Sequence, residues 1–228
     1  MVEEYLSDRE QEEALRSWWR ENWRWILGGI ALGMALLYGW NYFQTYREER
    51  AFRAAKLYAE IEAAVNGDNA DKAGQLLNGM TSDFDSSAYA QEARLLVAKS
   101  HVNHGKFDDA APLLRAVMDK SKDKEMAQIA RLRLARVFLQ QGKHDEALKL
   151  LDTQTAGEFA AQEREIRGDA NFAKGDKEAA RAEYAAALAG TKADAQIDRP
   201  LVELKLQEVG GVAPSASPAP PSVVPVEK

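Results

Sequence analysis

The longest uninterrupted apolar run in the chain covers residues 25–46, which contain no formally charged side chain. As a helix it would rise about 33 Å at 1.5 Å per residue, enough to cross the roughly 30 Å hydrocarbon core of a bilayer. Arg24 and Arg47 flank the run and aromatic residues crowd its two ends, as is typical of membrane–water interfaces. We therefore predict a transmembrane helix over residues 25–46, in contact with the lipid bilayer; the alternative is a buried helix of a soluble protein.

The residues before this run, 1–24, are predicted to form an amphipathic segment and not a cleavable signal peptide. A signal peptide starts with a short basic stretch, and its apolar run is followed by small residues. Here the start mixes acidic with basic residues, and the run ends in tyrosine, tryptophan and phenylalanine. Ser7 and Glu10 have the spacing of a capping box, which predicts a helix from about Asp8 to Arg20. This helix either lies on the membrane surface or leads into the span; a solvated acidic tail is the alternative.

Two features bear on the packing and the orientation of the span. Gly29 and Gly33 are four residues apart, a spacing that lets two helix backbones approach closely, so they are candidates for helix packing in the membrane. Four basic residues lie close to the span on each side, and the positive-inside rule counts basic residues only. The flanking charges therefore do not indicate which side of the membrane holds the C-terminal part of the chain.

From residue 47 onward the apolar positions keep a helical spacing and then fall into a repeat. Each copy has a turn that begins with glycine, then an alanine, and then a large side chain four residues after that alanine. The alanines recur at intervals of 37, 37 and 33 residues. They are Ala73, Ala110, Ala147 and Ala180, and the large residues that follow them are Leu77, Leu114, Leu151 and Tyr184.

This repeat has a mechanical explanation. A glycine can end one helix in the left-handed conformation, the alanine lets two helices approach closely, and the large residue fills the space between neighbouring pairs. The same logic underlies tetratricopeptide repeats, whose period is about 34 residues, although the tryptophan and proline of that consensus are missing here. We predict an all-α fold in which residues 47–209 form a tetratricopeptide-like solenoid of helical hairpins; a plain helical bundle is the alternative.

The C-terminal end is predicted to close the solenoid and then to lose order. Asp198 and Pro200 have the pattern of a helix start, and Leu201, Leu204 and Leu206 are expected to cover the open end of the stack. Residues 210–228 are rich in proline, alanine and serine, a composition that cannot form a packed core. We predict a flexible, disordered Pro-rich tail there, with a docking peptide as the alternative.

Composition limits the chemistry that the chain can perform. The net charge of −6 argues against binding nucleic acid, and the absence of cysteine excludes disulfides, zinc–thiolate sites and thiol nucleophiles. His101 and His104 are three residues apart on an expected helix, but no further ligands accompany them, and a zinc site needs three or four. We therefore predict no catalytic residues, no metal, no cofactor and no enzymatic activity.

A helical-repeat solenoid usually works through a concave surface lined by the first helix of each pair. Counting along these helices by the repeat pattern places six polar residues on that surface, and we predict them as a partner-binding face. They are Lys99, Asn103, Arg136, Gln140, Gln162 and Asp169. The alternative is an ordinary solvated helix face.

Several stretches of the chain follow a pattern seen in a known family. They are residues 21–22, 28–33 and 39–40 in the anchor, 132–137 and 147–152 in the centre, and 167–169, 174–177 and 180–181 near the end. These stretches resemble the YfgM-type ancillary subunit of the bacterial Sec translocon. The resemblance extends from Leu6 to Val209 in order and without large gaps, and the Pro-rich tail departs from it.

The resemblance implies a single-pass protein of the bacterial inner membrane, with its N-terminus in the cytoplasm and its tetratricopeptide-like domain in the periplasm. The partners it implies are the Sec translocon channel, the periplasmic chaperone PpiD and newly exported client proteins. The function it implies is non-catalytic assistance to proteins that have just been exported. Regulation of an envelope stress-signalling partner and an envelope-assembly scaffold are the alternatives.

Overall fold

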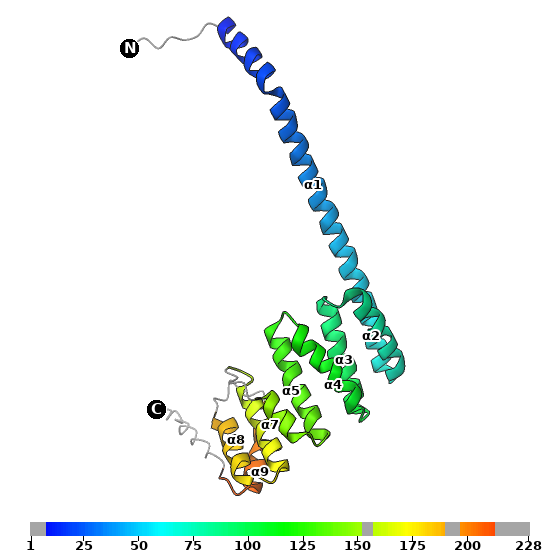
Figure 1. Ribbon diagram of the computed structural model, residues 1–228, viewed down its shortest axis with the longest axis vertical. Coiled ribbons are helices and arrows are strands. Elements are labelled where there is room, and N and C mark those ends of the chain that lie inside the picture. The colour runs from blue at the N-terminus through cyan, green and yellow to red at the C-terminus, as the bar shows by residue number, and fades with distance from the viewer. Residues whose placement is uncertain (1–7, 152–156, 190–196, 213–228) are drawn as a thin grey trace, which may run out of the picture. The chain divides into compact units, whose positions relative to one another are not determined.

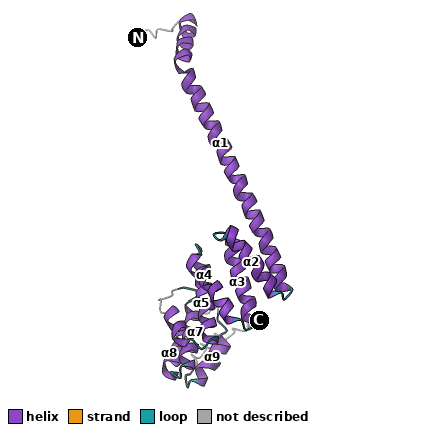
Figure 2. Ribbon diagram, turned by 45° about the vertical axis from the view of Figure 1, so that its right-hand side comes forward, coloured by secondary structure: helices purple, strands orange, loops and turns teal. Residues whose placement is uncertain are grey.

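The computed structural model describes residues 8–151, 157–189 and 197–212 (Figure 1). These residues form nine α-helices and no strand. Figure 2 colours the helices purple and the loops teal. The prediction of an all-α chain is confirmed. The helices are α1 (Asp8–Asn66), α2 (Ala70–Phe84), α3 (Ala88–Asn103), α4 (Phe107–Lys120), α5 (Lys124–Gln140), α6 (His144–Leu150), α7 (Ala160–Ala173), α8 (Lys177–Ala189) and α9 (Arg199–Glu208).

The chain divides into two compact units, Met1–Arg53 and Ala54–Lys228. In the first unit the described residues belong to α1, and most of their large apolar side chains are exposed; Trp25 is 81% exposed and Leu37 is 72% exposed. In α1 one apolar stretch is long enough to cross a membrane, and none of it is buried inside the structure. A core helix of a soluble protein would be mostly buried, and the described residues of this stretch are not.

The second unit is a series of helical hairpins. The last turns of α1 contribute Ala54 and Ile61 to a core that they share with α2 and α3. After them, α3 pairs with α4, α5 with α6 and α7 with α8, and α9 packs on α8. The helix α5 also contacts α7, so the first helices of adjacent hairpins lie side by side. This is the expected tetratricopeptide-like arrangement.

The glycine turns end the first helix of each hairpin as predicted. Gly105, Gly142 and Gly175 have φ values of 70°, 73° and 84°, in the left-handed region where a side chain is strained. In each turn the N–H after the glycine bonds back to a carbonyl of the preceding helix, as in Lys143 N–H to Phe138 O at 2.8 Å. In the looser first copy, Asp68 takes the left-handed conformation at φ 56° in place of Gly67. Aspartate tolerates this region better than most residues do.

The repeated small and large residues form the core of the second unit. All four repeat alanines are fully buried, and the large residues that follow them are at most 3% exposed. Gly168 shows why one hairpin needs glycine at its crossing point. A Cβ placed there would lie only 2.4 Å from Cε1 of Tyr184, the large residue of α8. The ring of Tyr184 is therefore accommodated because α7 has no side chain at position 168.

The end of the solenoid is closed by a different face of α9 from the one predicted. Val202, Leu206 and Val209 are buried, whereas Leu201 and Leu204 are exposed. The prediction was right for Leu206 and wrong for the other two leucines, because a helix buries positions spaced three and four apart, and the chosen set did not follow that period. Asp198 caps α9 by accepting from the Leu201 N–H at 3.3 Å. The tail prediction concerns residues that, from 213 on, lie outside the described part of the chain.

Candidate functional site

A cleft of about 600 Å³ opens between α3, α4 and α5 in the second unit. Its floor is apolar, and its remaining lining residues are three cations and one amide. The residues that line it are Ala98, Lys99 and Val102 from α3, Phe107 and Leu114 from α4, and Arg133, Arg136, Val137 and Gln140 from α5. A pocket with apolar walls and a few convergent polar groups is the usual form of a binding site.

Helical spacing brings the polar residues of the cleft to one side. Arg133, Arg136 and Gln140 are three and four residues apart, so they lie one above another on the same face of α5. The residues between them, including Leu134 and Ala135, are buried in the core. The start of α5 is fixed by Asp123, whose side chain accepts from two N–H groups of the first turn. The core and the cap together hold this face toward α3.

The cleft is electropositive. Lys99, Arg133 and Arg136 are all exposed at its edge. Partial burial, and then the neighbouring charge of Arg136, lower the pKa of Arg133, although the group stays cationic at every physiological pH. Arg136 Nη2 lies 4.0 Å from Glu165 Oε2, at the limit of an ion pair. Within residues 8–151, 157–189 and 197–212, neither Lys99 nor Arg133 has an acidic partner. The arrangement can attract carboxylates.

Of the six residues predicted for the partner-binding face, three line the cleft and three lie outside it. Lys99, Arg136 and Gln140 meet in the cleft. Asn103 is exposed at the last residue of α3 and does not line the cleft, and Gln162 is half-buried on α7. The cation Arg133 was missed, although its position one turn before Arg136 on the same helix is a signal that could have found it.

Asp169, the sixth residue, is engaged inside the repeat domain. Its carboxylate accepts from the hydroxyl of Tyr184 at 2.8 Å, and its two oxygens lie 2.8 and 2.9 Å from Nζ of Lys205 on α9. The same ammonium donates to Glu165 Oε1 at 2.9 Å. Burial would lower the pKa of Lys205, but the hydrogen bonds to Asp169 and Glu165 outweigh it and leave that pKa raised. These contacts fasten α9 to α7 and α8.

Tyr184 is held in its neutral form by the same surroundings. Burial, followed by the charge of Asp169 and the hydrogen bond to it, raises the pKa of this tyrosine. The neighbouring Glu183 accepts from Arg164 and Arg167 of α7, both at 2.9 Å. The carboxylates of Asp169 and Glu183 are therefore both paired with cations of the chain itself.

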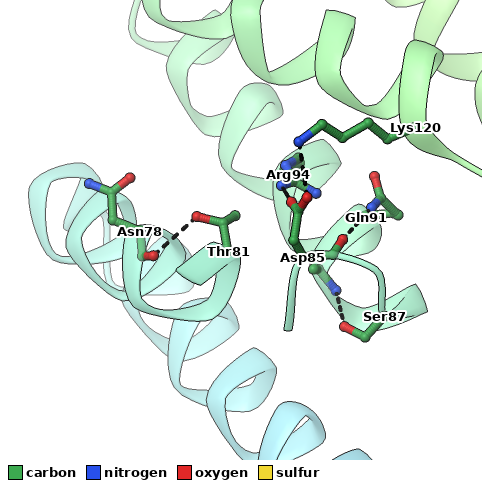
Figure 3. A network of polar contacts seen from close by, with 8 residues as sticks. Asn78, Thr81, Asp85, Ser87, Gln91, Arg94 and Lys120 are labelled. Carbon is green, nitrogen blue, oxygen red and sulfur yellow. Dashed lines mark hydrogen bonds and ion pairs between the residues drawn. The ribbon is translucent and has the colours of Figure 1, made fainter. Parts of the chain in front are cut away.

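A second internal network fixes the turn between α2 and α3 (Figure 3). The carboxylate of Asp85 accepts from Arg94, which is only 4% exposed, and from Nζ of Lys120 at 2.9 Å. The amide of Gln91 donates to the carbonyl of Asp85 at 2.8 Å. The hydrogen bonds from Lys120 and Arg94 lower the pKa of Asp85. Because the carboxylate is bound to two cations of the chain itself, this network is structural.

The two histidines considered as metal ligands lie in different surroundings. His104 lies with Nδ1 2.7 Å from the carbonyl of Ser100 and with Nε2 2.9 Å from Oδ1 of Asp68. Burial lowers the pKa of His101, which favours its neutral form. In the described parts of the chain no three metal-binding side chains converge.

Gly29 and Gly33 lie in the exposed part of α1. A Cβ placed at either position would meet no atom within 4 Å. In the first unit these two positions are thus open to a neighbouring helix, and their packing role in the membrane stays a prediction.

Comparison with known proteins identifies a family for most of the chain. A family model described as a tetratricopeptide repeat-like domain matches residues 16–211. The chain is also similar to proteins named ancillary SecYEG translocon subunit. It is 31% identical to the one of Haemophilus influenzae over 96 residues, and 29% identical to the one of Aggregatibacter actinomycetemcomitans over 103 residues. These two alignments cover 42% and 44% of this chain and 47% and 49% of the relatives, about half their length.

The match to the relative of the same name from Escherichia coli K12 extends much further. It is 30% identical over 193 residues, which cover 85% of this chain and 91% of that protein. An alignment of this extent covers most of the chain. Together with the family model, it means that the chain belongs to the family of ancillary SecYEG translocon subunits, whose fold here is a tetratricopeptide-like repeat domain.

Proposed function

We propose that this protein is a non-catalytic ancillary subunit of the Sec translocon, anchored in the inner membrane and binding other proteins through its repeat domain. The observation that carries the proposal is the alignment over 91% of an Escherichia coli protein of that name. The exposed apolar stretch of α1 supports the anchor, because large apolar patches that face solvent are rare in soluble monomers.

The parts of the chain take different roles in this proposal. Residues 25–46 cross the bilayer, residues 1–24 stay on the cytoplasmic side and residues 47–209 form the repeat domain in the periplasm. The orientation rests on the family resemblance, since the basic residues on the two flanks balance. Fusion of reporters to Lys228 tests it: a reporter active only in the periplasm is expected to work, and one active only in the cytoplasm is not.

The anchor and the cleft act together. Tethering a binding domain beside the channel raises its effective concentration near emerging chains, so that moderate affinity is sufficient. The partners in this proposal are the translocon channel, the chaperone PpiD and newly exported proteins. No bond is made or broken in such a role; the residues of the cleft hold a partner by burying apolar surface and by pairing its charges.

Photocrosslinking in native membranes tests this function. A photoreactive residue placed at Gln140, inside the cleft, is expected to give adducts with channel subunits, the chaperone or exported chains. The matched control is the same residue at Lys124, which is exposed on the same helix but lies outside the cleft. Adducts with a cytoplasmic response regulator would favour a signalling role instead. Adducts with envelope-assembly proteins alone would favour a scaffold, and co-purification without any translocon component would reject the proposal.

A further inference from the structure

We propose that the cleft between α3, α4 and α5 binds a protein segment in which acidic side chains flank a large apolar side chain. This inference rests on the proposed function, in that it assigns a chemical class to the partner of the repeat domain. It adds what family membership does not supply: which residues bind, and what they select.

The apolar part of the selection comes from the floor of the cleft. Val102, Phe107, Leu114 and Val137 reach the cleft surface from three helices. Its volume of about 600 Å³ lies within the range of roughly 300–1,000 Å³ that is usual for ligand pockets. A leucine or phenylalanine side chain placed there would leave water and contact carbon atoms on several sides, which is the main source of affinity at such anchors.

The acidic part comes from a local reversal of charge. The chain as a whole carries −6, yet the cleft presents three cations, Lys99, Arg133 and Arg136. Arg133 and Arg136 lie one turn apart on α5, so their like charges repel each other. An incoming carboxylate would remove this repulsion and form charge-assisted hydrogen bonds with guanidinium groups. A basic or neutral segment would leave the repulsion in place.

The distribution of the cations favours a segment with several acidic side chains over a single terminal carboxylate. Lys99 comes from α3, whereas the two arginines come from successive turns of α5. Acidic residues spaced along a segment can reach cations on both helices, whereas a single terminal carboxylate offers one point of contact. Gln140, one turn beyond Arg136, offers an amide that can both donate to and accept from a peptide backbone. The hydrogen bonds that this amide can form with a peptide backbone favour a peptide over a lipid headgroup as the occupant of the cleft.

The test uses the full chain in nanodiscs of zwitterionic lipid and a fluorescent synthetic peptide that alternates glutamate with phenylalanine. Two matched peptides carry lysine in place of glutamate or serine in place of phenylalanine. Fluorescence anisotropy is expected to show binding of the first peptide and at least about tenfold weaker binding of the other two. Its affinity is expected to fall as salt is raised, because the charges at the edge of the cleft are accessible to ions.

The protein variant R133E/R136E is expected to bind the acidic peptide at least about tenfold more weakly than the natural chain. The control Lys124→Glu reverses a charge on the same helix outside the cleft and is expected to leave binding unchanged. Circular dichroism checks that each variant is folded. Should the double reversal prevent folding, the neutral variant R133Q/R136Q replaces it, with the same direction of effect expected.

The inference is overturned if the lysine peptide binds as well as the acidic one, or if the folded double variant binds the acidic peptide normally. It is also overturned if vesicles of phosphatidylglycerol displace the peptide and themselves fail to bind R133E/R136E, because the occupant would then be an anionic lipid. In all of these cases crosslinks from Gln140 to translocon components would leave the proposed function standing. If the natural chain gave no such crosslinks, the proposed function itself would be overturned.

Discussion

Two regions of the repeat domain place charged residues on the first helices of their hairpins, but they use them differently. In the middle region, at α3–α5, Lys99 and Arg133 have no acidic partner among the described residues. At the α7–α9 end, Glu165 and Asp169 share the ammonium of Lys205. The same position in the repeat is therefore open to a partner in one hairpin and closed by the chain's own helix in another.

The difference follows from what lies next to each helix. The inner side of α7 is met by α9, whose Lys205 supplies the matching charge and whose Val202 and Leu206 complete the core. The cleft, by contrast, is bounded by α3, α4 and α5 and keeps an apolar floor beside its cations. The last hairpin of a solenoid must be closed for the protein to be soluble. Charges at that end are therefore paired within the chain, whereas the middle of the solenoid keeps free charges.

The largest expected effect concerns the closed end and its central ring. Tyr184 is 2% exposed and packs against the bare backbone of Gly168, so Tyr184→Ala would leave a cavity that the surrounding helices cannot fill. We expect a loss of about 3–5 kcal/mol in the free energy of unfolding, measured by denaturant titration followed by circular dichroism. Lys99→Ala in the cleft is the control, with a change within about 0.5 kcal/mol. Equal losses in the two variants would contradict the distinction between the closed end and the cleft.

The next effect tests the charges themselves. Lys205→Met keeps the aliphatic stem but leaves Glu165 and Asp169 without their shared cation. Because the side chain of Lys205 is 23% exposed, solvent screens part of the penalty, and we expect a loss of about 1–3 kcal/mol. The matched change in the cleft, Arg133→Met, breaks no described ion pair and is expected to cost less than about 0.5 kcal/mol. A larger loss of unfolding free energy in Arg133→Met than in Lys205→Met would contradict this expectation.

The stability difference between the natural chain and Lys205→Met should also depend on pH. The folded-state pKa of Lys205 is raised, so its contribution is complete below the ordinary lysine pKa of about 10.4. It is then lost as the pH rises through the folded-state value. We expect the difference in melting temperature between the two proteins to be constant between pH 7 and 9 and to shrink above about pH 10.5. A gap that stays constant to pH 12 would show that Lys205 acts through packing alone.

The sequence was sufficient to predict the features that depend on local spacing. The buried alanines, the large residues after them and the left-handed Gly105, Gly142 and Gly175 all recur within one hairpin, so periodicity reveals them. The left-handed Asp68 did not follow the glycine pattern, because aspartate can occupy the same conformation.

The partners of the inner-face residues could not be predicted in this way. Asp169 meets Lys205 across 36 residues, and this contact depends on how α9 packs against the preceding hairpin. In the same manner, Arg133 and Lys99 meet in one cleft only because α3 and α5 lie together. Spacing gives the face of a helix on which a residue lies, whereas the neighbouring helix decides whether that residue is paired.

The smallest expected effect has the opposite sign. Arg133 and Arg136 are like charges one turn apart on α5, and such pairs destabilise a helix by about 0.2–0.5 kcal/mol. Arg133→Gln should therefore leave the free energy of unfolding unchanged or raise it by about that amount, while it weakens binding of an acidic segment. A domain selected for stability alone would have lost the repulsion between these two arginines. Residues that reduce stability and serve binding are therefore a sign of selection for function. Replicate denaturant titrations of Arg133→Gln and of the control Lys124→Gln would measure this small change in the free energy of unfolding. A destabilisation of Arg133→Gln by more than about 1 kcal/mol would mean that Arg133 belongs to the structural charges.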